Sequence, residues 1–128
     1  MAGSTTVFNV AGVVTGLADA DLAQFIRVKI TATGYAVAAK ADRADGITQE
    51  AIASGAYGSI KLLSGADVNF GTASGATIAA GVKVYSTSAG ELSSTKATGS
   101  FEEGVSITAA GADEIFEWRY KPSSVAES

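Results

Sequence analysis

The chain has 128 residues and a mass of 12.8 kDa, the size of one domain that can bury a core. It contains neither His nor Cys, which excludes disulfides, thiol nucleophiles and histidine-based catalysis or metal binding. Nine basic residues stand against 13 acidic ones, so the formal net charge is −4. This balance argues against a nucleic-acid partner, because binding phosphates requires a clustered Lys/Arg surface.

The hydropathy pattern argues against a membrane partner. Mean hydropathy is positive, at +0.25, but no uninterrupted apolar run approaches the roughly 18 residues that a membrane span needs. Residues 1–6 lack the basic and apolar regions of a secretory signal. We therefore expect a soluble protein that is made in the cytoplasm.

The first 16 residues form an apolar segment without a charged side chain. We interpret residues 1–16 as an extended N-terminal arm or a first strand that needs a partner surface, which is the chain's own sheet, a neighbouring subunit or something larger. The candidate contact residues are Val7, Phe8, Val10, Val13 and Val14.

Short alternating segments, broken by Gly and small polar residues, predict an all-β fold. We expect a compact small β-barrel or sandwich-like domain over residues 17–121, followed by a flexible C-terminal tail over residues 122–128. The predicted strands are 7–14, 25–31, 35–39, 46–48, 59–63, 68–70, 82–85, 105–108 and 115–120.

Two of these strands carry a clear facing prediction. Alternation over 25–31 places Ile26, Val28 and Ile30 in the core and leaves Arg27 and Lys29 in solvent. In the last strand, 115–120, alternation places Phe116, Trp118 and Tyr120 on one face, and we expect these aromatics to anchor the core. The opposite face of that strand carries Ile115, Glu117 and Arg119.

The helical signal is weak. Asp19 or Asp21 predicts a capped turn that runs to Phe25, and residues 48–53 predict one short helix closed by Gly55. Neither segment is long enough to organise the fold.

One phrase occurs twice along the chain. Gly46-Ile47-Thr48 and Gly104-Val105-Ser106 each lead through a small-residue turn, Gly55-Ala56 or Gly111-Ala112, into a further strand. Matching segments, Val28-Lys29-Ile30 and Val82-Lys83-Val84, lie upstream. The pattern indicates either two β-rich halves of similar plan or a chance recurrence of small residues.

Residues 46–60, 75–85 and 90–92, with Gly104-Val105 after them, resemble the capsid-decoration, or head cement and stabilisation, proteins of tailed bacteriophages. The resemblance covers roughly residues 26–120. It implies a compact β-barrel-like domain, commonly a homotrimer, on the outer surface of the capsid. Its partner there would be the major capsid protein, and its role would be to clamp neighbouring capsomers in the virion. Such a role needs no catalytic residue, cofactor or metal.

The charged residues give no competing site. We expect the basic side chains to be solvated, and we expect the carboxylates to lie at turns, also solvated. The paired replacements Glu102/Glu103 or Asp42/Asp45 by amides are accordingly predicted to change stability by no more than about 1 kcal/mol. The basic residues are Arg27, Lys29, Lys40 and Arg43. The acidic residues form three groups: Asp42 and Asp45 with Glu50; Glu102 with Glu103; and Asp113 with Glu114.

Three other interpretations remain open. A β-sandwich binding module for host attachment or carbohydrate is the alternative function. A small hydrolase would need two carboxylates in unlike environments across a cleft, and a structural calcium ion would use turn carboxylates and carbonyls. Because turn carboxylates are ordinarily solvated and no Asp-x-Asp-x-Asp loop is present, we expect no enzyme activity and no bound metal.

Overall fold

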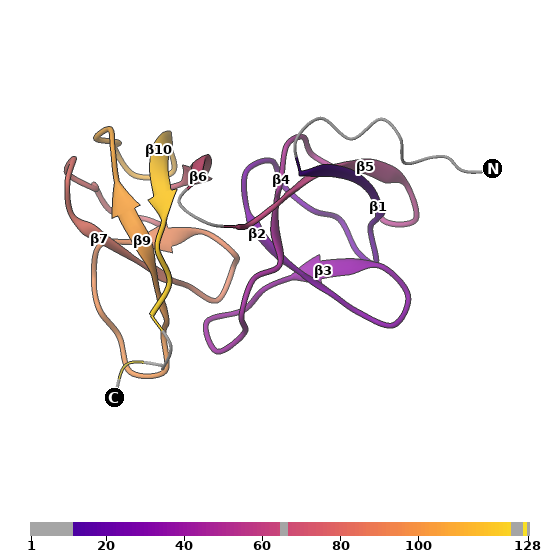
Figure 1. Ribbon diagram of the computed structural model, residues 1–128, viewed down its shortest axis with the longest axis horizontal. Coiled ribbons are helices and arrows are strands. Elements are labelled where there is room, and N and C mark those ends of the chain that lie inside the picture. Colours follow the sequence, from indigo (N-terminus) through magenta and orange to yellow (C-terminus); the bar gives the residue numbers. More distant parts are fainter. Residues whose placement is uncertain (1–11, 65–66, 124–126, 128) are drawn as a thin grey trace.

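The computed structural model describes residues 12–64, 67–123 and 127, which form ten strands in two antiparallel sheets of five (Figure 1). The first sheet has the order β1-β5-β4-β2-β3 and the second the order β6-β10-β9-β7-β8. The strands of the first sheet are β1 (Val13–Leu17), β2 (Arg27–Ile30), β3 (Tyr35–Val37), β4 (Gly46–Thr48) and β5 (Tyr57–Leu62). Those of the second are β6 (Val68–Thr72), β7 (Lys83–Ser86), β8 (Leu92–Ser93), β9 (Glu102–Ser106) and β10 (Ile115–Tyr120).

The all-β prediction is confirmed, but both helical predictions are wrong. The described residues contain no helix, so none there is long and apolar enough to cross a membrane. Leu22 and Ile52, one from each predicted helical segment, instead form an antiparallel bridge and exchange two backbone hydrogen bonds of 2.8 Å. This long-range pairing outweighs the weak local helix propensity.

The two sheets have the same plan, so the internal repeat is a structural duplication. The order of β6 to β10 in the second sheet repeats that of β1 to β5 in the first. In each half the sheet coils until its two edges meet at a single parallel bridge, Ala18 with Tyr35 and Ala73 with Leu92. Each half is therefore strongly curved without being a closed barrel, and the two lie side by side in a sandwich-like arrangement (Figure 1).

A buried hydroxyl fixes the same turn in both halves. Thr48 and Ser106 end β4 and β9, and each hydroxyl accepts a backbone N–H and donates to a backbone carbonyl. The distances agree within 0.1 Å, at 3.0 and 2.6 Å for Thr48 and 3.1 and 2.6 Å for Ser106. The partners are Ile26 and Ala23 for Thr48, and Val82 and Ala79 for Ser106.

The glycine that opens the repeated phrase is required by packing. A Cβ on Gly46 would lie 2.7 Å from Ile60 Cγ2 and 2.9 Å from the Lys61 carbonyl oxygen. On Gly104 it would clash with the carbonyl oxygen of Arg119. Since Gly46 pairs with Leu62 in β5 and Gly104 with Tyr120 in β10, the coiling of each sheet brings backbone against backbone there.

The sequence alignment of the repeat is wrong by two residues at its second glycine. The structural equivalent of Gly55 is Asp113, not Gly111, since both have positive φ, 82° and 63°. Their N–H groups make the same bond, to the carbonyls of Ala18 and Ala73. Asp113 occupies a conformation that favours glycine, so identity of residue type misleads the alignment here.

The core is divided between the halves. Phe116 and Trp118 are buried in the second half, and Tyr120 packs against them, which confirms the predicted aromatic anchors. Ile47, from β4 of the first half, is completely buried in that second cluster. The first cluster comprises Ala18, Leu22, Ile26, Val28, Ile52 and Ile60; the second comprises Ile47, Ala73, Ile78, Val84, Leu92, Ala110, Phe116 and Trp118.

Most predicted strands exist, with shifted bounds. The two-residue β8 was not predicted, and the strand expected at 105–108 is β9, Glu102–Ser106. Ile30, predicted to face the core, is 58% exposed, because β2 reaches the rim of its sheet there.

Candidate functional site

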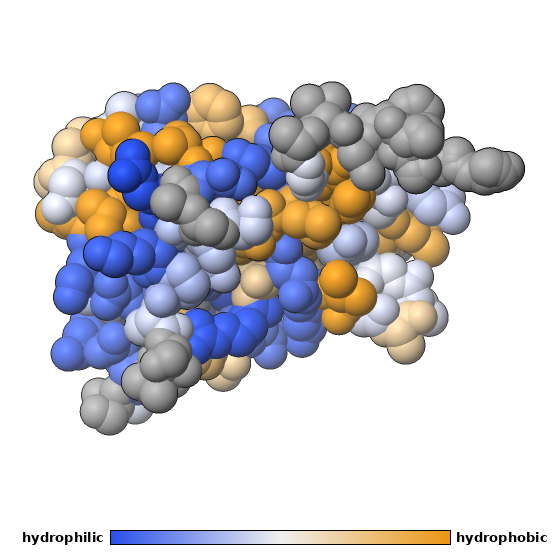
Figure 2. Space-filling model, viewed as in Figure 1, coloured by the Kyte–Doolittle hydropathy of each residue, from blue (hydrophilic) through white to orange (hydrophobic). Residues whose placement is uncertain are grey.

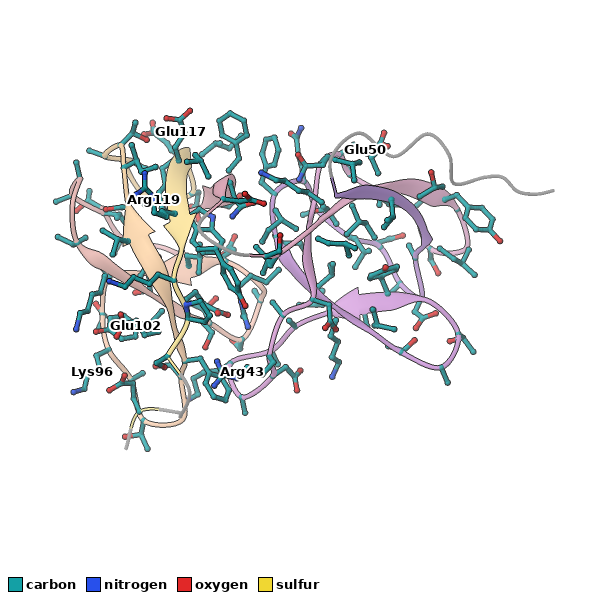
Figure 3. The ribbon with its side chains drawn as sticks, in the orientation of Figure 1. Arg43, Glu50, Lys96, Glu102, Glu117 and Arg119 are labelled. Carbon is teal, nitrogen blue, oxygen red and sulfur yellow. The ribbon has the colours of Figure 1, made fainter. Side chains whose placement is uncertain are left out.

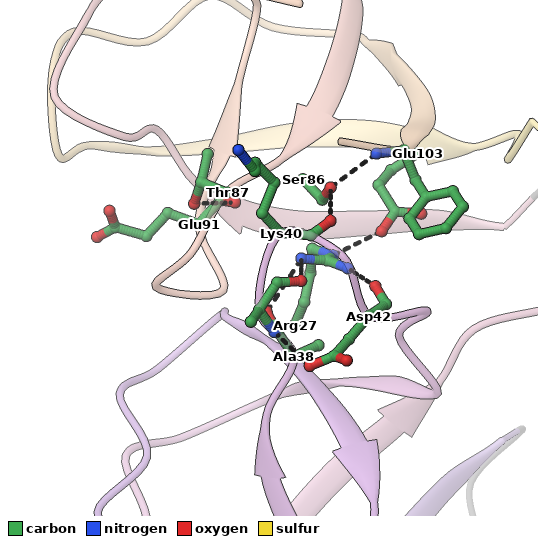
Figure 4. A network of polar contacts seen from close by, with 10 residues as sticks. Arg27, Ala38, Lys40, Asp42, Ser86, Thr87, Glu91 and Glu103 are labelled. Atoms are coloured by element: carbon green, nitrogen blue, oxygen red, sulfur yellow. Dashed lines mark hydrogen bonds and ion pairs between the residues drawn. The ribbon is translucent and has the colours of Figure 1, made fainter. Parts of the chain in front are cut away.

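Two features of the molecule are candidates for a functional role. The first is a buried polar network at the junction between the halves (Figure 4). The second is the outer face of the second sheet.

The centre of the junction is an ion pair between the halves. Arg27 Nε on β2 donates to Glu103 Oε2 on β9 at 2.6 Å, and both side chains are buried, at 0% and 2% exposed. The prediction that these residues are solvated is wrong. Alternation placed Arg27 on the outer face of its sheet, as the structure does, but that face is covered by the second half.

The remaining Arg27 nitrogens bind backbone carbonyls (Figure 4). One donates to Ala38 at 3.1 Å and the other to Asp42 at 2.7 Å. Burial lowers the pKa of Arg27 and raises that of Glu103, and in each case the attraction of the partner opposes the effect of burial. Desolvation therefore outweighs pairing, as is common for buried ion pairs.

Neighbouring hydrogen bonds attach the same two surfaces. Ser86 Oγ at the end of β7 donates to the Lys40 carbonyl at 2.7 Å and accepts the Phe101 N–H at 2.8 Å. The Arg27 N–H donates to the Gly90 carbonyl at 2.9 Å. We conclude that this network joins the halves, since its polar groups are engaged with each other.

A strained aromatic residue completes the junction. Phe25 has φ of 55°, and the residue at the equivalent place, Gly81, has φ of 78°. The Phe25 N–H donates to the carbonyl of Thr48, and the Gly81 N–H donates to the carbonyl of Ser106. The Phe25 ring lies 5.1 Å from that of Phe70 on β6, so the strain at Phe25 accompanies a contact between the halves.

The other predicted charged residues do not gather at one place: Glu50 accepts the Ser59 N–H in the first half, and Glu114 accepts the Gly111 N–H in the second. Lys29 Nζ lies 2.9 Å from Asp42 Oδ2, and this bond, with one from the Ala39 N–H, lowers the pKa of Asp42. Arg43 stacks 3.8 Å from the centre of the Phe101 ring. Among residues 12–64, 67–123 and 127, no three acidic side chains lie close enough to hold a metal ion.

The outer face of the second sheet is the main exposed apolar surface that the register brings together. On β6 and β10, Phe70 lies opposite Glu117 and Val68 opposite Arg119. Ile107 lies beside Glu117, because the Ile107 N–H donates to the Glu117 carbonyl at 2.8 Å. The exposed fractions of its large apolar residues are 50% for Ile115, 44% for Phe70, 42% for Val68 and 40% for Ile107.

We call these four residues, with Glu117 and Arg119, the outer face. Figure 3 shows the side chains of Glu117 and Arg119 on β10, and Figure 2 shows apolar and charged surface intermixed over this half. Neither charged side chain has an ion-pair or hydrogen-bond partner among the described residues. The sequence predicted the facing of β10 correctly but not its neighbour β6, which lies 43 or more residues earlier in the chain.

The predicted N-terminal contact residues divide into two groups. Val7, Phe8 and Val10 lie outside the described residues. Val13 and Val14 belong to β1, where they pair with Lys61 and Ile60 of β5, and Val14 also packs against the first core cluster.

No protein-family model matches the sequence, and no curated protein matches it. Among solved structures, the chain is similar to the N base of the head fiber gp8.5 of bacteriophage phi29, with a TM-score of 0.70 and 13% identity. The similarity covers 90% of this chain and 98% of that one. At this identity the comparison establishes a shared fold, which includes both halves of the duplication.

Proposed function

We propose that the chain is a structural virion protein that binds the outside of an assembled phage capsid. The observation that carries the proposal is the likeness to the phi29 head fiber base over 98% of that base. A base that attaches a fiber to a head and a protein that decorates a head share one requirement, a rigid domain with a shell-binding surface. The buried junction supplies that rigidity here.

The finer part of the proposal rests on the resemblance to head cement proteins. The chain acts as a homotrimer, its partner is the major capsid protein, and its binding stabilises contacts between capsomers. Many weak contacts repeated over a symmetric shell give strong attachment without a deep pocket or a cofactor.

Mass and head binding test this proposal in sequence. Native mass measurement at micromolar concentration should give three times the chain mass of 12.8 kDa, and the protein should then co-sediment with assembled heads of the phage that carries its gene. A heat-unfolded sample of the same protein is the control for trapping in the pellet. A monomer with affinity for carbohydrate and none for heads would instead favour the alternative, a host-attachment or carbohydrate-binding module.

The N-terminal segment is predicted to contribute to this binding. Val7, Phe8 and Val10 carry apolar area without a nearby charge, and burying one such side chain is worth roughly 1.5 to 3 kcal/mol. Deleting residues 1–10 should leave a folded domain, because β1 begins at Val13, and should weaken head binding or trimer formation at least tenfold.

Circular dichroism and thermal unfolding establish that the truncated chain is folded before its binding is measured. Full-strength binding by the folded truncated chain would show that the contact surface lies elsewhere. Failure to fold would show that the segment belongs to the chain's own sheet.

A further inference from the structure

The two halves use the outer faces of their sheets differently. In the first sheet part of this face is covered, since Ile47 of β4 and Arg27 of β2 are fully buried beneath the second half. In the second sheet, Val105 of β9 holds the place of Ile47 and is only partly buried. The equivalent part of the second sheet, where Val105 pairs with Arg119 of the outer face, is therefore less completely covered.

A basic side chain marks the same difference. Lys61 on β5 pairs with Val13, and its equivalent Arg119 on β10 pairs with Val68. Lys61 Nζ donates to the Val68 carbonyl of the other half at 2.6 Å, whereas Arg119 has no such partner among the described residues. The Arg119 guanidinium is thus able to donate hydrogen bonds to an acceptor on another chain.

At two positions the outer face of the second sheet is also more apolar than its counterpart in the first. Thr15 and Phe70 hold the same place, one residue before the equivalent glycines Gly16 and Gly71 of β1 and β6. Gln49 and Ile107 are equivalent because each donates its N–H across to the neighbouring strand, at 2.9 and 2.8 Å. The second half has Phe and Ile where the first has Thr and Gln, a change that costs solubility unless the face is covered.

The charges on this face are complementary to themselves. Glu117 and Arg119 lie on the same side of β10, two residues apart, with apolar residues on both flanks. A second copy can place its Arg119 against Glu117 and its Glu117 against Arg119, or a ring of copies can do so in turn. A single acidic or basic partner surface would leave one of the two charges opposed by its own sign.

We propose that the outer face of the second sheet is the surface through which copies of this chain associate. The inference rests on the trimer in the proposed function and names its contact: Val68, Phe70, Ile107 and Ile115 make the apolar part, and Glu117 with Arg119 sets the alignment. The occupant is a second copy of this chain, whose own outer face carries the same residues.

Charge reversal and re-pairing test this contact. Glu117→Arg and Arg119→Glu should each raise the dissociation constant of the oligomer about tenfold or more, and the double variant, with both charges exchanged, should restore association. Sedimentation over a range of concentrations measures the constants. At concentrations low enough for the chains to be monomeric, unfolding temperatures should stay unchanged, since both side chains lack partners within the described part of the chain.

A matched pair of apolar substitutions separates the two halves. Ile115 and Tyr57 begin β10 and β5 at equivalent positions, and they are 50% and 71% exposed. Ile115→Ser should weaken association, and Tyr57→Ser, on the first half, should leave it unchanged. Equal weakening by the two would overturn the assignment to the second sheet.

The remaining outcomes distinguish this inference from the proposed function. An oligomer that persists in all the variants refutes the contact and leaves the virion role standing. Variants that stay trimeric but lose co-sedimentation with heads also refute it, because the face would then contact the shell. A wild-type monomer that binds heads refutes both the contact and the trimer, while a chain that neither associates nor binds heads refutes the proposed function itself.

Discussion

Replacing Arg27 by Met is expected to lower the free energy of unfolding by about 3 to 5 kcal/mol, because Glu103 would remain buried without its partner. Glu103→Gln should be costly for the same reason, since Arg27 would keep its charge. Chemical denaturation at neutral pH measures both. The sequence-based expectation that a Glu102/Glu103 double amide changes stability by no more than about 1 kcal/mol assumed a solvated Glu103, and the burial of that side chain contradicts the assumption.

Removing both charges together is the informative comparison. The double variant Arg27→Met with Glu103→Leu should be much more stable than either single variant, since burial already outweighs pairing at this site. Lys29→Met is the matched surface control. Lys29 and Asp42 are 39% and 30% exposed, and such pairs contribute about 0 to 1 kcal/mol. If Arg27→Met lowered the free energy of unfolding no more than Lys29→Met does, the expected cost of leaving Glu103 buried without a partner would be contradicted.

Gly104→Ala is expected to destabilise the protein by about 3 kcal/mol or more, at the upper end of overpacking effects. The added Cβ would meet the carbonyl oxygen of Arg119, and a backbone atom in a paired strand cannot move aside as a side chain can. Gly104 lies in the middle of β9, between β10 and β7. The strain would therefore spread to both neighbours.

Gly111→Ala is the control for this substitution. There the Cβ would lie 3.0 Å from Glu114 Oε1, the end of a flexible side chain that can rotate away. We expect a loss well under that of Gly104→Ala in thermal unfolding. Equal losses would mean that chain flexibility, and not the backbone clash, determines the effect of both changes.

The alternation of apolar and polar residues predicted the strands because each strand has one face in a core. β10 is the clearest example, with Phe116 and Trp118 inside and Ile115, Glu117 and Arg119 outside. The repeat was visible for a related reason: Gly46 and Gly104 occupy places where no Cβ fits, so the duplication retains them.

Contacts between distant segments could not be predicted in this way. Alternation placed Arg27 correctly on the outer face of β2, but whether that face meets water depends on Glu103, 76 residues away. The helix expected at 48–53 fails similarly, since Ile52 pairs with Leu22 across the first half. The apolar part of the outer face also depends on β6 lying beside β10, which no local pattern shows.

The contact between the halves has a consequence for assembly. It joins unlike surfaces, since Arg27 and Ile47 of the first half meet Glu103 and the core cluster of the second, and a contact of that kind repeated between molecules would add units without end. Two apolar residues on the first half's side of this contact, Phe25 and Leu63, are replaced at the equivalent places of the second half by Gly81 and Lys121. A second copy that docked on the second half in the same way would lack both apolar contacts, which disfavours head-to-tail addition of units.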